Sequence, residues 1–462
     1  MIENTTKGVS ILHGDPKKAI LKLSIPMMFA MVVNSLYTLI DGIWIGGLGD
    51  TSLAAIGFIN PLYIIVNGFS TGLGVGATSV ISRYIGERNK KQVDNAGIHV
   101  LLLIAILSLA FTLILVLFLQ EILSGMGVDN RLMDICLSYG QIFFLGSIFI
   151  VFTSAAYGIL RAEGNVTKAT YGIVVGAVIN MILDPVFIYT LNLGVFGAGL
   201  ASILSLAFVS VLLIYWFKKE TYVKFSLKNF NFQLNLIKKI LSVGIPSGIE
   251  MWVVGFSMLF FNYVLFLVSD IQGVAVFNAG WRVVAAVMVI PLAIGMSSVA
   301  VTGANYGAGK FENLKVIYNY SIKFSFLVVT IMATFIFIFA PQISYLFAYL
   351  PELADIRDLI SEFLRVTCLF YFPLPLGITA SSFFLGVGKG FSSLLITIIE
   401  LLVLEMIFIY ILAIICGFGQ QGVWYGIILG NGCGSIFGYF YARRHINRLN
   451  KKSKIGLTKL HS

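Results

Sequence analysis

The chain has 462 residues, of which 58% are hydrophobic and only 11% are charged, and its mean hydropathy is +0.94. A soluble protein of this length needs about a quarter of its residues charged to cover its surface, so the composition excludes a soluble domain. The formal net charge of +10 therefore indicates basic loops at a membrane surface and not a nucleic-acid partner.

Long apolar runs predict α-helices that cross a bilayer. Residues 101–119 contain no charged side chain and are long enough, at about 1.5 Å per residue, to span most of a hydrocarbon core about 30 Å thick. The strands of a membrane β-barrel would alternate apolar and polar residues, which these runs do not. We predict an all-α integral membrane protein with twelve transmembrane helices, called spans 1 to 12, at 19–46, 53–82, 96–120, 132–159, 167–191, 195–217, 237–268, 273–304, 315–340, 358–385, 391–416 and 421–443.

The distribution of Lys and Arg predicts which helix ends face the cytoplasm. With the N-terminus inside, 26 of the 31 basic residues fall in the terminal segments and the inner loops. Two, Arg131 and Arg357, fall in outer loops. This positive-inside bias predicts a multi-pass protein of the cytoplasmic membrane with both termini in the cytoplasm.

Weak internal similarity predicts two repeated halves. Gly74 recurs as Gly295, and the tripeptide at 187–189 recurs at 408–410, both at an offset of 221 residues. Six spans is an even number, so the halves share one orientation, as in parallel repeats related by a pseudo-two-fold axis along the membrane normal. A transport cleft between two bundles is favoured over a purely structural duplication. We predict two six-helix bundles at 1–218 and 237–446, a cytoplasmic linker at 219–236 and a basic tail at 447–462.

Polar side chains in the first six spans gather at one estimated depth. Asp41 and Tyr37 are one helical turn apart on span 1 and share a helix face, as Asp184 and Asn180 do on span 5. The residues at this level, roughly 8–16 Å below the outer surface at about 1.5 Å per residue, are Tyr37, Asp41, Tyr139, Asn180, Asp184 and Ser202.

Ionisable side chains inside a membrane are costly and are therefore functional candidates. No Lys or Arg lies at this level to neutralise the two carboxylates. Carboxylate, amide and hydroxyl oxygens without a counter-charge suit a small cation or a shared proton. Pro185 directly follows Asp184, which predicts a bend and a freed carbonyl. We predict a cation-coupling site, which is also the ligand set if the ion is Na⁺, at Asp41, Asn180, Asp184 and Ser202.

The C-terminal half contains a different polar network. Arg282 on span 8 and Glu405 on span 11 fall at similar estimated depths, so we predict that they form an ion pair. Glu405 occupies the position equivalent to Asp184 in the first half. Glu250 on span 7 is either a second proton site, a substrate contact or a buried, hydrogen-bonded carboxyl. Asn262 on the same span completes the predicted network.

Several motifs of the first half form one recognisable set. They are Ile25-Pro26 and Asp41-Gly42-Ile43-Trp44 on span 1, residues 72–77 and 83–86 at the end of span 2, residues 158–165 after span 4, and Asn180 with Asp184-Pro185 on span 5. Together they resemble the multidrug and toxic compound extrusion (MATE) family over nearly the whole chain. The carboxylates of the first half resemble its DinF-like branch.

The resemblance implies a secondary antiporter that exports cationic or lipophilic organic compounds in exchange for H⁺ or Na⁺. In the DinF-like branch, the positions matching the six polar residues above form the cation site and its hydrogen-bond network. We expect the protein to work in the lipid bilayer as a monomer. Pro26 is the candidate bend of span 1, and Ser154 and Tyr157 replace an Asn-rich stretch that faces Asp184 in the family. Glu250 lies closer to Pro246 than the corresponding acid does in relatives with a C-half site, so that role is not transferred.

Other function classes fit the sequence less well. A lipid or lipid-linked oligosaccharide flippase of the same broad superfamily remains the alternative, although such proteins usually have a basic cavity and Arg282 is the main base at that depth here. An intramembrane enzyme that binds Mg²⁺-pyrophosphate would need an acidic cluster, which the sequence lacks. The four cysteines show no metal or redox spacing. We therefore expect a transporter and not an enzyme, with no cofactor, and the two-bundle repeat disfavours a passive channel.

Overall fold

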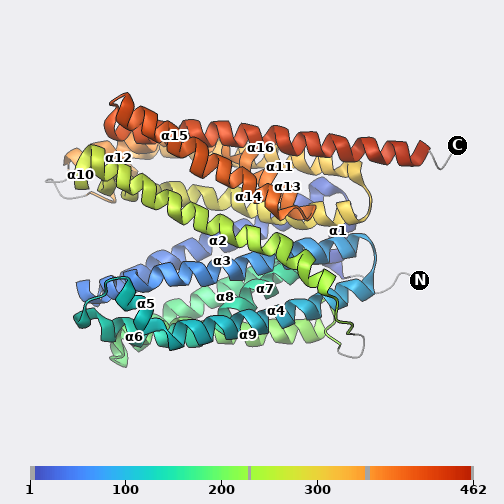
Figure 1. The fold of residues 1–462 in the computed structure, drawn as a ribbon, viewed down its shortest axis with the longest axis horizontal. Helices are drawn as coiled ribbons and strands as arrows, with labels where there is room; N and C mark the ends of the chain where they lie inside the picture. Colours follow the sequence, from blue (N-terminus) through green and yellow to red (C-terminus); the bar gives the residue numbers. More distant parts are fainter. Residues whose placement is uncertain (1–5, 227–229, 349–353, 459–462) are drawn as a thin grey trace. The chain divides into compact units, whose positions relative to one another are not determined.

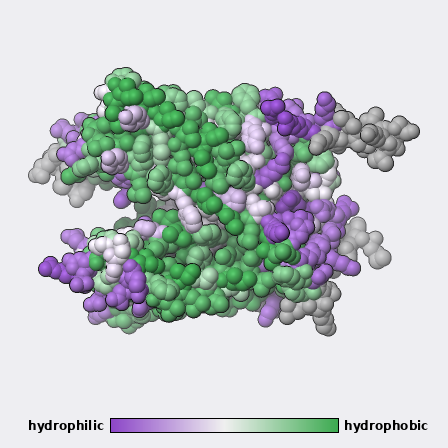
Figure 2. Space-filling model, in the orientation of Figure 1, coloured by the Kyte–Doolittle hydropathy of each residue, from purple (hydrophilic) through white to green (hydrophobic). Residues whose placement is uncertain are grey.

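The computed structural model describes residues 6–226, 230–348 and 354–458, and every regular element within them is a helix (Figure 1). The chain divides into two compact units, which we call the first unit (1–15 and 25–249) and the second unit (16–24 and 250–462). Hydrophobic side chains cover the flanks of the helices on the face drawn, and hydrophilic ones gather at the helix ends (Figure 2). This banding fits helices that lie across a bilayer.

The first unit is a bundle of helices around an apolar core. Leu119, Phe143 and Phe144 are buried at its centre. Helix α2 (Pro16–Gly46) contributes the part that follows Ser24. The other elements are α1 (Lys7–His13), α3 (Asp50–Gly86), α4 (Lys90–Leu117), α5 (Leu119–Gly125), α6 (Asn130–Leu145), α7 (Ser147–Ala162), α8 (Val166–Pro185), the π-helix η1 (Val186–Thr190), α9 (Gly194–Lys219) and the beginning of α10 (Leu234–Gly307).

The second unit has its own core, in which Phe277, Phe363 and Trp424 pack edge to face or stack with their neighbours. It contains most of α10. The elements that follow are α11 (Phe311–Tyr345), α12 (Ala354–Thr367), η4 (Cys368–Tyr371), α13 (Leu374–Gly386), α14 (Gly390–Thr397), η5 (Ile398–Glu405), α15 (Met406–Ile409), η6 (Tyr410–Ile415) and α16 (Gly419–Thr458).

These helices confirm the predicted all-α membrane fold. Eight helices among the described residues are long and apolar enough to cross a bilayer, and two bent helix pairs also qualify. Helix α10 is 74 residues long and holds two spans, because Asp270, with φ of 53°, interrupts its helical geometry. Helix α16 covers the last predicted span, 421–443, although it is less apolar than the others, so each of the twelve predicted spans coincides with a helical segment.

Bends fall at only some of the prolines within the spans. The bent pair that ends at α13 turns by 48° just before Leu374, at Pro373. The other pair, α6 and α7, turns by 46° at Gly146, where a Cβ would stand only 2.2 Å from Ile203 Cδ1. The bend therefore coincides with a glycine against which Ile203 of α9 packs closely. Pro26 and Pro61 lie inside the continuous helices α2 and α3.

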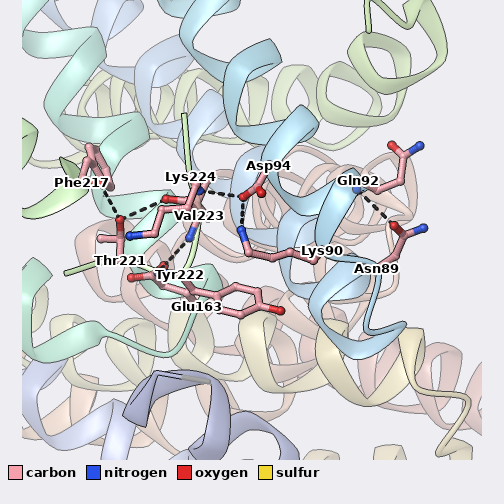
Figure 3. Close-up of polar contacts among 10 residues, drawn as sticks. All are labelled: Asn89, Lys90, Gln92, Asp94, Glu163, Phe217, Thr221, Tyr222, Val223 and Lys224. Carbon is pink, nitrogen blue, oxygen red and sulfur yellow. Dashed lines mark hydrogen bonds and ion pairs between the residues drawn. The ribbon is translucent and has the colours of Figure 1, made fainter. Parts of the chain in front are cut away.

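The segment between α9 and α10 is tied to the first unit by two carboxylates (Figure 3). Glu163, at the end of α7, accepts hydrogen bonds from the backbone N–H groups of Tyr222 at 2.7 Å and Val223 at 3.2 Å. Asp94 on α4 pairs with Lys90 and accepts from the backbone N–H of Lys224 at 2.7 Å. Glu163 is fully buried, and this burial raises its pKa to about 7.

The first turns of α10 pack against α3 within the first unit. A Cβ on Gly72 would stand 2.2 Å from the carbonyl oxygen of Gly244, and a Cβ on Gly76 would stand 2.5 Å from that of Ile240. The two compact units are thus divided inside α10, after Ile249, whereas the predicted linker covers 219–236. Residues 227–229 of that linker and 459–462 of the predicted tail lie outside the described residues.

Candidate cation and substrate site

A cavity of about 540 Å³ lies within the first unit, between α2, α3, α6, α7, α8 and α9. Seven of the nine residues predicted for this half line it: Tyr37, Asp41, Tyr139, Ser154, Tyr157, Asn180 and Ser202. Asp184 lies behind the wall and is fully buried. Pro26 is not part of the lining, although Met27 beside it is. Seven of the residues predicted from the sequence therefore face one cavity.

Asp41 and Asp184 meet at this wall. Their carboxyl groups are within hydrogen-bonding range of each other, although they come from spans 143 positions apart in the sequence. Two carboxyl groups can form such a contact only when a proton lies between them. Asp41 is partly exposed to the cavity, whereas Asp184 is 0% exposed. One member of the pair can thus exchange with the cavity while the other is sealed.

Asn180 connects the pair to α9. Its amide orientation is assigned from its neighbours, with Nδ2 donating to Asp184 Oδ2 at 2.7 Å and the amide oxygen accepting from the backbone N–H of Ser202 at 3.2 Å. One turn of α8 separates Asn180 from Asp184, which is the spacing that places both on one face. The amide therefore fixes the direction of the Asp184 carboxyl.

The π-helix after Pro185 positions α2 against α8. Tyr189 on η1 donates its hydroxyl to the carbonyl oxygen of Trp44 at 2.6 Å, and the two rings lie edge to face. Gly47 makes this approach possible, because a Cβ there would stand 2.1 Å from the Tyr189 hydroxyl. This anchor at the end of α2 holds Asp41, one turn earlier, beside Asp184.

A polar row on α3 was missed by the sequence analysis. Asn67 donates to the Tyr63 hydroxyl at 2.6 Å and accepts from Thr71 at 3.0 Å, and all three line the cavity. Their spacing of four residues in an apolar span was the available signal. Phe143 packs against both Tyr63 and Tyr139, so an aromatic surface adjoins this row.

Comparison with known proteins identifies the family. The MatE family model matches residues 26–186 and 246–411, one stretch in each half of the chain. The chain belongs to the MATE family.

The proteins to which the chain is similar are named as transporters of, or as giving resistance to, different compounds. The chain is 23% identical over 397 residues to a protein named FAD transporter from Shewanella oneidensis, covering 84% of this chain and 86% of that one. It is 24% identical to the probable multidrug resistance protein YoeA of Bacillus subtilis, covering 70% and 72%. A solved structure of a multidrug resistance MATE family transporter in an outward-facing conformation is 39% identical, with a TM-score of 0.95 over 97% of this chain and 100% of that one.

In this MATE chain the predicted ion pair between Arg282 and Glu405 is not formed. Arg282 is exposed and Glu405 is 1% exposed, and no ion pair joins them among the described residues. The predicted pairing is therefore wrong, because similar depth on two helices does not put two side chains on facing sides. Ser393 on α14 hydrogen-bonds Glu250, and Asn262 accepts from Asn278 at 2.9 Å.

Glu400 is a further acid of the second unit that the sequence analysis overlooked. Its Oε1 accepts from Asn431 Nδ2 on α16 at 2.7 Å. Glu400 and Glu405 are five residues apart, a spacing that separates two side chains on an α-helix. Both belong to the π-helix η5, whose wider turn brings their side chains back to the same side of the helix. No pattern in the sequence predicted this π-helix.

Proposed function

We propose that this protein is a secondary active antiporter of the DinF-like branch that exports cationic or lipophilic organic compounds in exchange for H⁺ or Na⁺. The coupling cation binds at the Asp41–Asp184 pair, with Asn180 and Ser202 as neighbouring oxygen and amide groups. The observation that carries the proposal is the contact between these two carboxyls beside a cavity of about 540 Å³. A cavity of a few hundred Å³ suits a drug-sized ligand.

The pair couples ion binding to helix position. With one proton between them, the carboxyls attract each other and hold α2 against α8. Without it, two negative charges face each other at short range and repel. A cationic substrate near Asp41 favours the deprotonated arrangement, so substrate and proton compete, as antiport requires. Pro26 removes one backbone hydrogen bond from α2 and is the position where that helix can bend.

The lining of the cavity favours cations over anions. Among the described lining residues Asp41 is the charged one, and no lysine or arginine is present. A molecule with phosphate groups, such as FAD or a lipid-linked oligosaccharide, would bring negative charge to this acidic wall. The Tyr63, Tyr139 and Phe143 rings offer faces that attract flat cations. We place both termini in the cytoplasm and expect a monomer.

The test is transport by the purified protein in liposomes. A pH gradient and a Na⁺ gradient are imposed separately, and the movement of a fluorescent cationic dye is followed. The variants are Asp41→Asn and Asp184→Asn. Asp134→Asn is the matched control, because Asp134 is an exposed aspartate on α6 that does not line the cavity.

Dye movement driven by one gradient, lost in both cavity variants and retained in the control, supports the proposal and identifies the ion. The contact between the carboxyls favours H⁺ as that ion. Movement that survives both substitutions would place coupling elsewhere. Failure of either gradient to move any dye, with movement of a fluorescent lipid instead, would favour the flippase.

A further inference from the structure

The second unit contains two acids that the proposed antiport does not use. Glu405 is 1% exposed, and its Oε1 has no hydrogen-bond partner among the described residues. Glu400 on the same π-helix is partly exposed and is bound by Asn431. Glu405 is therefore buried within the second unit, whereas Glu400 is partly exposed at its surface.

A row of glycines on α16 presses its backbone against these acids. A Cβ on Gly430 would stand 2.4 Å from Glu405 Cα, and a Cβ on Gly434 would stand 2.6 Å from Glu400 Cβ. Gly426 and Gly422 meet Ile409 and Ala413 in the same way. Backbone-to-backbone contact at this distance leaves no room for a side chain from α16 and excludes water from the Glu405 side.

Two further polar atoms of α16 lie near this contact and have no hydrogen-bond partner among the described residues. Ser435 Oγ is 0% exposed and has no partner among the described residues, and the same holds for Asn431 Oδ1 at 1%. Ser435 Oγ and Glu400 Oε2 lie 2.5 Å and 3.0 Å from the point where a Cβ on Gly377 of α13 would stand. Both unpartnered oxygens therefore come from α16, and Ser435 Oγ lies close to the same point beside Gly377 as Glu400 Oε2. Most buried polar atoms in proteins are hydrogen-bonded, so a group of unpartnered ones beside a carboxyl indicates a functional role.

No ion pair to Glu400 or Glu405 is found in the part of the chain that the structure describes. The ion pairs found among the described residues are Lys90–Asp94 and Lys168–Glu220, both in the first unit. Glu400 is close enough to Glu405 for the two carboxyl groups to repel each other when both are ionised. Helix α16 meets the pair with glycines, Asn431 and Ser435, which carry no charge. An ionised, unpaired carboxylate inside a membrane protein is costly, and a bound proton removes that cost.

We propose that Glu400 and Glu405, with Asn431 and Ser435, form a second proton-binding site in the second unit, separate from the Asp41–Asp184 pair. Glu405 holds the proton. Glu400, which is partly exposed, is the group through which the proton enters and leaves, and the π-turn of η5 sets the two acids on one side. Asn431 donates to Glu400 and leaves Oδ1 as an acceptor when Glu400 is protonated.

Infrared difference spectroscopy of the purified full-length protein tests this site directly, because a protonated carboxyl has its own C=O stretching band. Spectra are recorded in acidic, neutral and alkaline buffer for the wild type, Glu400→Gln and Glu405→Gln. Glu312→Gln is the control, since Glu312 is an exposed glutamate of the same unit at the start of α11. Thermal unfolding of each variant checks that it is folded.

We expect the wild type to show at neutral pH one protonated-carboxyl band that Glu405→Gln lacks and Glu312→Gln retains. In acidic buffer, where Glu400 is protonated as well, Asn431→Ala is expected to shift the band that Glu400→Gln lacks, because it removes the hydrogen bond to Glu400 without deleting either acid. If Glu405→Gln leaves every carboxyl band of the wild type unchanged, Glu405 is ionised and the proposal is wrong. A Glu405 band that Na⁺ removes at constant pH would make this a sodium site and would equally overturn it.

Discussion

Span 5 of the first unit and span 11 of the second hold acids at equivalent positions, Asp184 and Glu405. Asp184 lies just before a π-helix, and Glu405 is the last residue of one. Their partners differ. Asp184 meets Asp41, which comes from another helix and lines a cavity. Glu405 meets Glu400 from its own helix, with the backbone of α16 pressed against both.

The two acid pairs therefore suit different roles for carboxylates in a membrane protein. An acid pair shared between two helices changes their attraction when its proton leaves, so it can drive one helix against the other. Two acids on one helix keep their separation and change only the charge of the unit that carries them. The first arrangement is suited to coupling transport to an ion, and the second to setting the pH range in which the unit is neutral.

The largest expected effect comes from neutralising the two equivalent acids one at a time and comparing transport. Asp184→Asn is expected to reduce gradient-driven dye transport at least about tenfold, since hydrogen bonds to charged groups contribute about 1.5–3 kcal/mol. Glu405→Gln at the equivalent position is expected to keep most of the transport and to shift its pH profile. Equal loss in both variants, measured in the same liposomes, would break the distinction.

The next effect concerns the glycine contact that seals Glu405. Gly430→Ala places a Cβ 2.4 Å from Glu405 Cα, so the helices must move apart, at a cost of about 1–3 kcal/mol. Gly432→Ala on the same helix meets nothing within 4 Å and is expected to be neutral or to stabilise by up to about 1 kcal/mol. Thermal unfolding in detergent measures both, and a Gly430→Ala variant as stable as Gly432→Ala would contradict the close packing.

The sequence predicted one of these regions better than the other. A period of 3.6 residues was enough to place Tyr37, Asp41, Asn180 and Ser202 on a common cavity, because α2, α8 and α9 are regular helices there. It failed for Glu400 and for the Arg282–Glu405 pair, because η5 departs from that period and estimated depth says nothing of rotation about the helix axis. The linker contacts of Glu163 could not be predicted, since they are made by backbone N–H groups.

Glu163 provides a third buried acid, outside the membrane spans, whose charge is compensated by two backbone N–H groups. Burial raises its pKa to about 7, above the ordinary value of 4.5, so the folded protein binds this proton more tightly than the unfolded chain. Its contribution to stability is therefore fully present at low pH and declines as the pH rises from about 4.5 through 7.

Replacing this acid by glutamine should remove that dependence. The unfolding free energy of the wild type relative to Glu163→Gln is expected to fall by at most about 3 kcal/mol as the pH rises through this interval. Unfolding midpoints of the two proteins across the interval check the sign. Glu312→Gln, at an exposed position, should track the wild type throughout, and a rise instead of a fall would show that the N–H groups outweigh the burial.

The smallest expected effect compares one amide in each unit. Asn67 joins Tyr63 and Thr71 on the cavity wall, and Asn278 bonds Asn262 in the second unit. Asn67→Ala removes hydrogen bonds worth about 0.5–1.5 kcal/mol from the cavity wall, so it should raise the KM for the dye roughly two- to tenfold with little change in the maximal rate. Asn278→Ala loses the same chemical group and should leave the KM unchanged. A KM raised by both substitutions would mean that the dye is held by the second unit as well, and the cavity of the first unit would then be only part of the substrate site.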